Sequence, residues 1–226
     1  MESTENTSND RTRSKVFFSV GMTLDGFIAP EGMDLAHAND PSYNDWLSQW
    51  MDLQKWMFEQ QFFRQNLKLG EGGETGKENS LLEASFKRTG ASIMGKRMFD
   101  GGERFWPEEA PFHTGVFVLT KQIRSPWERP GGTTFYFVNH GIESALRQAR
   151  EVAGGKDIRI AGGANVILQY LNAGLVDKFS IALAPVVFGT GVRLFDGIDR
   201  RKIALEVVEA THSPLVTNLR YIVHKK

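Results

Sequence analysis

The sequence contains no cysteine. This absence excludes disulfide bonds, thiolate nucleophiles, iron–sulfur clusters and cysteine-ligated zinc, including the zinc centre of nucleobase deaminases. Five histidines are present at positions 37, 113, 140, 212 and 224, and they form neither an HxH nor an HExxH pattern. We therefore expect no metal site. Hydrolase chemistry is also unsupported, because the serines of the predicted strands lie outside any nucleophile-elbow pattern.

A net charge and a long apolar run are missing as well. The 27 Lys and Arg residues equal the 27 Asp and Glu residues in number, so the chain carries no overall attraction for nucleic acid or anionic membranes. No stretch is long and apolar enough to cross a bilayer, and residues 1–15 lack the apolar core of a signal peptide. We expect a cytoplasmic protein that binds neither nucleic acid nor membrane.

The length and the apolar content indicate one enlarged domain. With 226 residues and 41% hydrophobic residues, the chain is long for one small domain, short for two, and able to bury a core. Residues 1–14 are rich in Ser, Thr, Asn and charged residues, which predicts a disordered N-terminal arm. Residues 15–226 are then the folded domain.

Short apolar runs alternate with amphipathic segments along most of this domain. This alternation predicts an α/β fold with a mixed, mostly parallel central sheet, helices on both faces and an antiparallel C-terminal edge. We expect strands at residues 15–22, 91–95, 116–120, 134–138, 157–161, 179–188, 203–211 and 219–226. We expect the later helices at residues 96–101, 142–152 and 164–174.

A tryptophan-rich region lies between the first and second strands. Its apolar residues fit helical spacing over residues 41–66, which predicts one long or broken helix. Residues 70–79, rich in Gly and Glu, are expected to form a flexible loop. A short helix over residues 81–88 is expected to end near Gly90 as its C′ residue.

The segment RIAGGANVILQYL, residues 159–171, runs from a strand through Gly162 and Gly163 directly into a helix. Such a turn points free backbone N–H groups at an anion, and glycine allows a pyrophosphate to approach the backbone. The alternative is a tight connection with no ligand. The segment has neither the full Rossmann spacing nor the Lys-Ser/Thr of a P-loop.

Two further predicted strands end in groups that are compatible with an anion. SIMGKRMFDGG places Lys96 and Arg97 in the first helical turn after Gly95, where cations oppose the helix dipole. These two residues are either a solvated basic turn or a clamp for the 2′-phosphate of NADPH. VFVLTK ends with Thr120 and Lys121. Because ligands of open α/β sheets collect at carboxyl ends of strands, the three sites together favour nucleotide binding.

In order along the chain, TLDGFIA, IMGKRMF, VFVLTK, IAGGANVI and APVVFGTGVRLF resemble the motifs of the dihydrofolate-reductase-like superfamily. They are most similar to those of the reductase domain of bacterial riboflavin biosynthesis and its stand-alone relatives. The resemblance covers residues 15 to about 225. It implies a reductase fold with NADPH as the cofactor. The zinc deaminase domain that precedes the bifunctional riboflavin enzyme's reductase domain is absent from this sequence.

The resemblance also implies roles for individual residues. The residues that would bind the adenosine 2′-phosphate are Gly95, Lys96 and Arg97, and those that would flank the adenine ribose are Leu119, Thr120 and Lys121. The pyrophosphate would bind to Gly162, Gly163, Ala164 and Asn165, with Val166 beside them. The nicotinamide would lie against Gly21, Ile28 and Ala29. A strand–loop motif that we interpret as structural or dimer-forming comprises Pro185, Gly189, Gly191, Leu194 and Phe195.

The substrate site departs from the superfamily pattern. Dihydrofolate reductases hold the pteridine with an acidic residue on the helix after the first loop, and here the tryptophan-rich region occupies that place. Asp34, Asp45 and Asp52 are candidates for this carboxylate. Trp46 either belongs to a core stripe or covers a flat heterocycle, and Trp106, in the loop FWPEEAPFH, either packs internally or closes the cleft.

The expected function is NADPH-dependent reduction of a small heterocycle of the pterin, diaminopyrimidinone or related imine type. Hydride would pass from C4 of the nicotinamide to an electrophilic carbon, with the proton taken from water. The alternative is a domain that binds NADPH, or a folate- or flavin-like ligand, without turnover. We also expect a homodimer, because FSIALAPVVFGTGVRLF is more apolar than a solvent-facing edge strand should be.

Overall fold

The computed structural model describes residues 14–33, 35 and 40–226. The arm predicted over residues 1–14 therefore lies outside the described residues apart from Ser14. The strands are β1 (Val16–Met22), β2 (Phe27–Ala29), β3 (Thr89–Gly95), β4 (Gly115–Leu119), β5 (Trp127–Arg129), β6 (Thr133–Val138), β7 (Asp157–Gly162), β8 (Lys178–Leu183), β9 (Val192–Arg193), β10 (Ile203–His212) and β11 (Thr217–Lys225). The α-helices are α1 (Pro41–Phe58), α2 (Gln61–Asn66), α3 (Lys77–Arg88), α4 (Lys96–Glu103), α5 (Gly141–Val152) and α6 (Ala164–Asn172).

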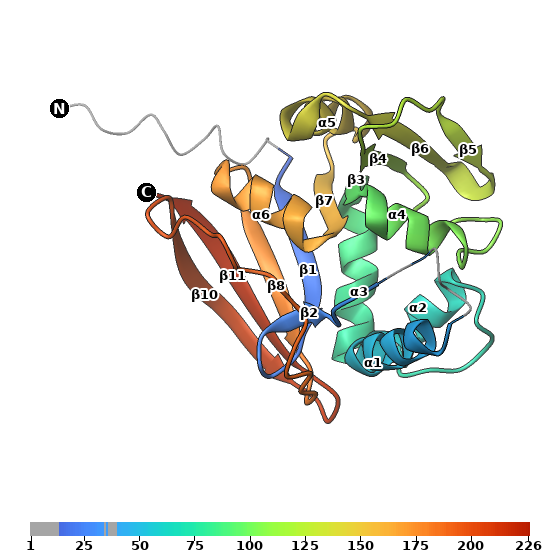
Figure 1. The fold of residues 1–226 in the computed structure, drawn as a ribbon, viewed down its shortest axis with the longest axis vertical. Helices are drawn as coiled ribbons and strands as arrows, with labels where there is room; N and C mark the ends of the chain where they lie inside the picture. Colours follow the sequence, from blue (N-terminus) through green and yellow to red (C-terminus); the bar gives the residue numbers. More distant parts are fainter. Residues whose placement is uncertain (1–13, 34, 36–39) are drawn as a thin grey trace.

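A large twisted sheet organises the described part of the chain (Figure 1). Its strand order is β10-β11-β8-β1-β7-β3-β4-β6-β5. The pairs from β8 through β1, β7, β3 and β4 to β6 are parallel, and β10, β11 and β8 pair antiparallel. The prediction of a mostly parallel sheet with an antiparallel C-terminal edge is confirmed. The opposite edge also ends antiparallel, because β5 pairs with β6.

Helices cover both faces of the sheet, as expected. On one face, alternate residues of β1 and β7, such as Phe18 and Ile160, share a buried cluster with Leu146 of α5 and Ile167 of α6. On the other face, Phe99 of α4 packs with β4 and β6, and Arg88 of α3 lies over the ring of Phe17 in β1. The strand positions that point away from α5 and α6 therefore meet α3 and α4.

The tryptophan-rich region forms a broken helix, since α1 ends at Phe58 and α2 begins at Gln61. Other boundaries differ from expectation. Helix α3 begins at Lys77, inside the predicted loop, and Gly90 belongs to β3 instead of capping the helix. A Cβ at position 90 would lie 2.2 Å from the carbonyl oxygen of Ala153, so glycine is needed there for a close backbone approach.

The prediction that FSIALAPVVF is one strand to residue 188 is wrong, because β8 ends at Leu183. Pro185 follows directly, and proline has no N–H group to donate to a strand ladder. β8 is also not an edge strand, since it pairs with β1 and β11. The short strands β2, β5 and β9 were not expected, and β2 and β9 form a small separate ladder.

Candidate functional site

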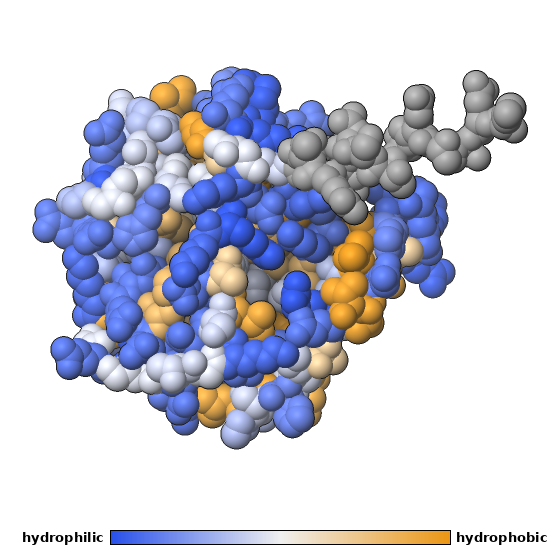
Figure 2. Space-filling view, turned by 180° about the vertical axis from the view of Figure 1, so that it is seen from behind, coloured by the Kyte–Doolittle hydropathy of each residue, from blue (hydrophilic) through white to orange (hydrophobic). Residues whose placement is uncertain are grey.

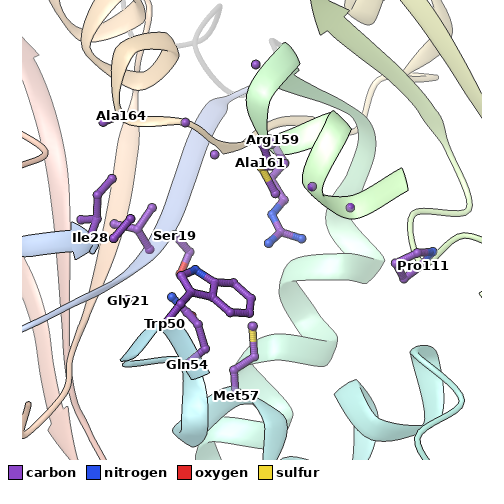
Figure 3. A pocket seen from close by; sticks show the side chains of 18 of the residues that line it. Ser19, Gly21, Ile28, Trp50, Gln54, Met57, Pro111, Arg159, Ala161 and Ala164 are labelled. Atoms are coloured by element: carbon purple, nitrogen blue, oxygen red, sulfur yellow. The ribbon is translucent and has the colours of Figure 1, made fainter. Parts of the chain in front are cut away.

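A cavity of about 1160 Å³ lies on the α3 and α4 side of the sheet, at the carboxyl ends of β1, β3 and β7 (Figure 3). Its walls come from α1, α3, α4, the start of α6 and the sheet itself. This is the sheet edge at which ligands of open α/β folds bind. Most of the residues that the sequence assigned to a cofactor line this one cavity: Gly21, Ile28, Ala29, Gly95, Lys96, Arg97, Leu119, Gly162, Gly163, Ala164, Asn165 and Val166.

The Gly162–Gly163 turn joins β7 to the first turn of α6. Gly163 has φ +92°, a left-handed conformation that favours glycine, and it occupies the N-cap position of α6. A Cβ at 163 would meet nothing closer than 3.9 Å, so the space in front of this turn is open. The first N–H groups of α6 lack intrahelical partners, as in any helix, and can bind an anion here.

Gly95 and α4 form a second glycine-to-helix turn next to the first. β3 pairs with β7, so that Met94 is the register partner of Gly162. A Cβ at position 95 would lie 3.1 Å from Val166, which means that the two turns approach closely. Two strand ends thus direct two helix N-termini toward the same part of the cavity.

The two basic residues of this turn differ in their environment. Lys96 forms an ion pair with Asp100, one turn further along α4. Arg97 is exposed, and among the residues that the structure describes it has no ion-pair partner. Because no described carboxylate pairs with it, the guanidinium of Arg97 can form charge-assisted hydrogen bonds with a phosphate.

The carboxyl end of β4 contributes less than expected. Leu119 lines the cavity, and its register partner is Gly95. Thr120 and Lys121 follow at the rim and do not line the cavity. Thr120 is tied into its own turn, because its hydroxyl accepts a hydrogen bond of 3.0 Å from the N–H of Gln122.

Gly21, Ile28 and Ala29 line the cavity on the β1 side of these turns, since β1 pairs directly with β7. A Cβ at position 21 would lie 3.1 Å from the side-chain amide of Gln54 in α1, which is buried and lines the cavity. Figure 3 shows Gln54 beside Gly21, with Trp50 above it. The absence of a side chain at position 21 lets a polar amide reach the floor of the cavity.

The loop before β2 is held in place by Asp25. Its carboxylate accepts hydrogen bonds from the Thr23 hydroxyl (2.5 Å) and from the N–H groups of Gly189 (2.7 Å) and Phe188 (3.3 Å). The Thr23 hydrogen bond, followed by these backbone N–H groups, lowers the pKa of Asp25 below its usual value near 3.8. This network positions the strand that carries Ile28 and Ala29.

Aromatic rings form the outer wall. Trp46 is buried, lines the cavity, and donates a hydrogen bond of 3.1 Å from Nε1 to the carbonyl of Pro30. Its ring is nearly parallel to that of Trp50, with 6.2 Å between centroids. Trp106 also lines the cavity, but its ring stacks on Phe135 at 5.3 Å and belongs mainly to the packing behind α4.

The candidate carboxylates are not brought into the site. Asp34 lies outside the described residues. Asp45 and Asp52 are exposed on α1 and do not line the cavity. Among the described residues, the carboxylate that lines the cavity is Glu78, in the first turn of α3. It was missed because residues 70–79 were interpreted as a loop.

Two other lining residues were also missed, Gln54 and Arg159. Gln54 lies on the buried side of α1, and helical spacing from Trp46 and Trp50 would have placed it there. Arg159 gives no such signal, because in DIRIA it alternates with buried isoleucines as a solvent-facing residue would. In the folded chain, α3 packs over the face of β7 on which Arg159 lies, and no local pattern predicts this packing.

The chain belongs to the family of RibD C-terminal domains, whose model matches residues 14–217. Two curated relatives, both uncharacterized proteins of Bacillus subtilis, share 37% identity over 86 residues and 34% over 59 residues. These matches cover 38% and 26% of this chain, and 45% and 33% of the relatives. The chain therefore spans less than half the length of either relative.

Solved structures share the dihydrofolate-reductase-like fold. A putative riboflavin biosynthesis protein from Shewanella sp. PV-4 has a TM-score of 0.62 at 18% identity, covering 93% of this chain and 99% of its own. A Thermotoga maritima diaminohydroxyphosphoribosylaminopyrimidine deaminase/5-amino-6-(5-phosphoribosylamino)uracil reductase has a TM-score of 0.55 at 15% identity, and the match covers 94% of this chain and 57% of that one. Dihydrofolate reductase from Enterococcus faecalis, complexed with NADP(H) and RAB-propyl, has a TM-score of 0.52 at 14% identity, and the match covers 93% of this chain and 96% of that one.

The described part of the chain has no helix that is both long enough and apolar enough to cross a membrane. Within that same part, no group of three or more His, Asp or Glu side chains is placed to hold a metal ion.

Proposed function

We propose that the protein is an NADPH-dependent reductase of a small planar heterocycle of the pterin, diaminopyrimidinone or related imine type. The observation that carries this proposal is the pair of glycine turns, Gly95 and Gly162–Gly163. They lie at neighbouring strand ends, and each opens a helix at the wall of the same large cavity. Two adjacent helix N-termini suit a ligand with phosphate groups at separate positions, as a dinucleotide has.

The residues present fit a pyrophosphate at the α6 turn. The space before Gly163 is open, and its backbone conformation is one that a side chain would strain. The free N–H groups of Ala164, Asn165 and Val166 and the positive end of the helix dipole favour negative charge there. A side chain at position 163 would project into the space that the phosphate oxygens need.

The preference for NADPH over NADH rests on the α4 turn. Arg97 is exposed and free of a carboxylate within the described residues, while Lys96 shares its charge with Asp100. A guanidinium binds phosphate with paired, charge-assisted hydrogen bonds, so Arg97 is the main group for the 2′-phosphate. Leu119, Thr120 and Lys121 lie beside it at the end of β4, in the region proposed for the adenine ribose.

The nicotinamide would lie against Gly21, Ile28 and Ala29, with the substrate between it and the Trp46–Trp50 stack. When bound, NADPH supplies the hydride. The chain's own contribution is to orient both rings and to exclude water, and the aromatic wall serves both purposes. Glu78 offers a carboxyl group that can bind ring N–H groups of a heterocycle or hold a proton near them.

The comparisons support the proposal at the level of the family. The Thermotoga protein is named as a deaminase/reductase, and the Enterococcus structure contains NADP(H). Membership of the RibD C-terminal domain family and a shared fold with these reductases support the same class of activity for this chain.

The test is steady-state oxidation of NADPH by the full chain with a panel of pterins, diaminopyrimidinones and quinones. We expect turnover with at least one heterocycle and none with Gly163→Val under the same conditions. Saturable NADPH binding without oxidation by any member of the panel would instead favour a domain that binds the nucleotide without turnover.

A further inference from the structure

Arg159 lies in the middle of β7 and faces the cavity. Its neighbours Ile158 and Ile160 are fully buried in the core beneath α5 and α6. Arg159 points to the opposite side of the sheet, under α3, where its guanidinium carbon lies 4.8 Å from the ring centroid of Phe86. Figure 3 shows the guanidinium directed into the open part of the cavity, on the same side as Ser19 and Trp50.

The charge of Arg159 is not balanced. No described residue accepts a hydrogen bond from its side chain or forms an ion pair with it, and its Nε is buried without a partner. Desolvation, followed by the nearby charge of Arg88, lowers the pKa of Arg159 to about 10, which still leaves it protonated at neutral pH. Arg159 is half-buried, so its charge is only partly hydrated, and no described carboxylate balances it.

Neighbouring cations on the same face each have a carboxylate within ion-pair distance, although the Nε of Arg88 is also buried without a hydrogen-bond partner. The Arg88 Nε lies 3.7 Å and the Lys178 Nζ 2.9 Å from the carboxylate of Asp157, and Arg220 is paired with Glu209. Arg159 thus differs from the basic side chains around it. Because it lacks a carboxylate partner among the described residues, Arg159 is the side chain that can bind an external anion.

Two serines line the same cavity near Arg159. Phe17 of β1 is the register partner of Arg159, and Ser19 follows two residues later. Ser19 and Ser180 are register partners on β1 and β8, and both line the cavity. The serine hydroxyls can donate hydrogen bonds, which suits an anion.

We propose that this end of the cavity binds an anionic group of the substrate, a carboxylate or a phosphate, through the guanidinium of Arg159. Ser19 and Ser180 are the further donors. The proposal deepens the reductase function, on which it rests for the identity of the ligand as substrate. It defines the substrate as an acidic heterocycle whose charged substituent is directed under α3, away from the nucleotide turns.

The distance from Glu78 to Arg159 indicates how long this substrate must be. Glu78 and Phe86 are eight residues apart on α3, which corresponds to about 12 Å along a helix axis. Both line the cavity. A ring system near Glu78 therefore needs a substituent of several bonds to bring its anionic group to Arg159.

The test is isothermal titration calorimetry with three probes that share one ring: benzoate, phenyl phosphate and neutral benzamide. Each is titrated into the full chain with and without NADPH. The variants are Arg159→Met, which keeps the length and removes the charge, and Arg159→Lys, which keeps the charge. The control is Arg124→Met, since Arg124 stacks on Phe137 and pairs with Glu103 outside the cavity.

We expect at least one anionic probe to bind about tenfold or more tightly than benzamide, since a charge-assisted hydrogen bond contributes roughly that ratio. Arg159→Met should abolish the preference, Arg159→Lys should retain part of it, and Arg124→Met should leave it unchanged. Whichever of benzoate and phenyl phosphate binds more tightly identifies the anion. No preference in the unmodified chain, or a preference that survives Arg159→Met, would overturn the proposal.

Thermal unfolding separates this role from a structural one. If Arg159 only packs against Phe86, its replacement should lower Tm. If it is a binding group with an uncompensated charge, Arg159→Met should leave Tm equal or higher, and the tighter anion should raise Tm in the unmodified chain alone. Anion binding without any NADPH binding would refute the reductase proposal and leave the Arg159 site standing, so the two failures are distinguishable.

Discussion

The carboxylate of Asp25 accepts a hydrogen bond of 2.7 Å from the backbone N–H of Gly189, across 164 residues of sequence. This contact joins the loop before β2 to the loop after β8. Arg193 strengthens the junction by donating from Nη1 to the Asp25 carbonyl at 2.9 Å. The carboxylate of Asp25 therefore helps to position the wall proposed for the nicotinamide, Ile28 and Ala29.

Asp25→Asn should destabilise the fold in a pH-dependent way. Because the folded-state pKa of Asp25 is lowered, its stabilisation is present above the unfolded-state value near 3.8 and is lost as the pH falls through the folded-state pKa. We expect a lower urea midpoint for the variant at neutral pH and a difference that shrinks in acid. Asp45→Asn is the control, since Asp45 is exposed and bonds only to Gln49 within the described residues. Equal midpoints for Asp25→Asn and the unmodified chain at neutral pH would contradict this role.

Arg97→Ala should weaken NADPH binding much more than NADH binding. A charge-assisted contact contributes about 1.5–3 kcal/mol, which corresponds to a roughly tenfold to hundredfold loss of NADPH affinity. Lys96→Ala should have a smaller effect, because Asp100 already neutralises Lys96. Lys87→Ala, which removes an exposed charge on α3 that is paired with Glu83, serves as the control in fluorescence titrations. The same loss for both nucleotides would refute a 2′-phosphate site.

Gly163→Val should abolish nucleotide binding while the protein stays folded. The side chain would occupy the open space before α6 and strain a φ of +92°. Gly155→Val is a matched control, because Gly155 has φ +81° and open space but lies in the turn after α5, away from the cavity. Circular dichroism and nucleotide titration on the same samples give the comparison. Loss of stability with residual binding in Gly163→Val would indicate a purely structural turn.

Self-association is predicted at the β10 edge. β10 is paired on one side only, and Leu205, Val207 and Val208 are exposed along it. Figure 2 shows hydrophobic atoms on the side formed by this edge, within a mostly hydrophilic face. An exposed apolar edge is relieved when two copies pair about a twofold axis.

Light scattering should therefore give a mass of about twice 25.4 kDa for the unmodified chain. Val207→Lys should shift it to the monomer, and Val152→Lys, at an exposed site on α5, should not. A monomeric unmodified chain at micromolar concentration would show that this edge remains unpaired.

Much of the fold and of the proposed nucleotide site could be predicted from local patterns. Gly95 and Gly163 each separate an apolar strand from an amphipathic helix, and this pattern is visible in the sequence. The end of β8 could also have been predicted, because Pro185 interrupts the apolar run. The short strands β2 and β9 lack a local signal, since their pairing depends on the Asp25 junction between distant loops.

The end of the cavity proposed for the substrate was less predictable. Glu78 was not predicted as a site residue, because the glycine-rich residues before it indicated a loop, whereas it lies in the first turn of α3. Arg159 alternates with buried isoleucines and has the local pattern of a surface residue. Which side of a strand is covered depends on how α3 packs, and that information is non-local.

The most direct test of the account is an equilibrium titration of the unmodified chain with NADPH and with NADH at the same ionic strength. We predict saturable binding of NADPH, with NADH at least about tenfold weaker because it lacks the phosphate that Arg97 would bind. Equal affinities for the two nucleotides, or no binding of either, would contradict the assignment of this cavity to NADPH.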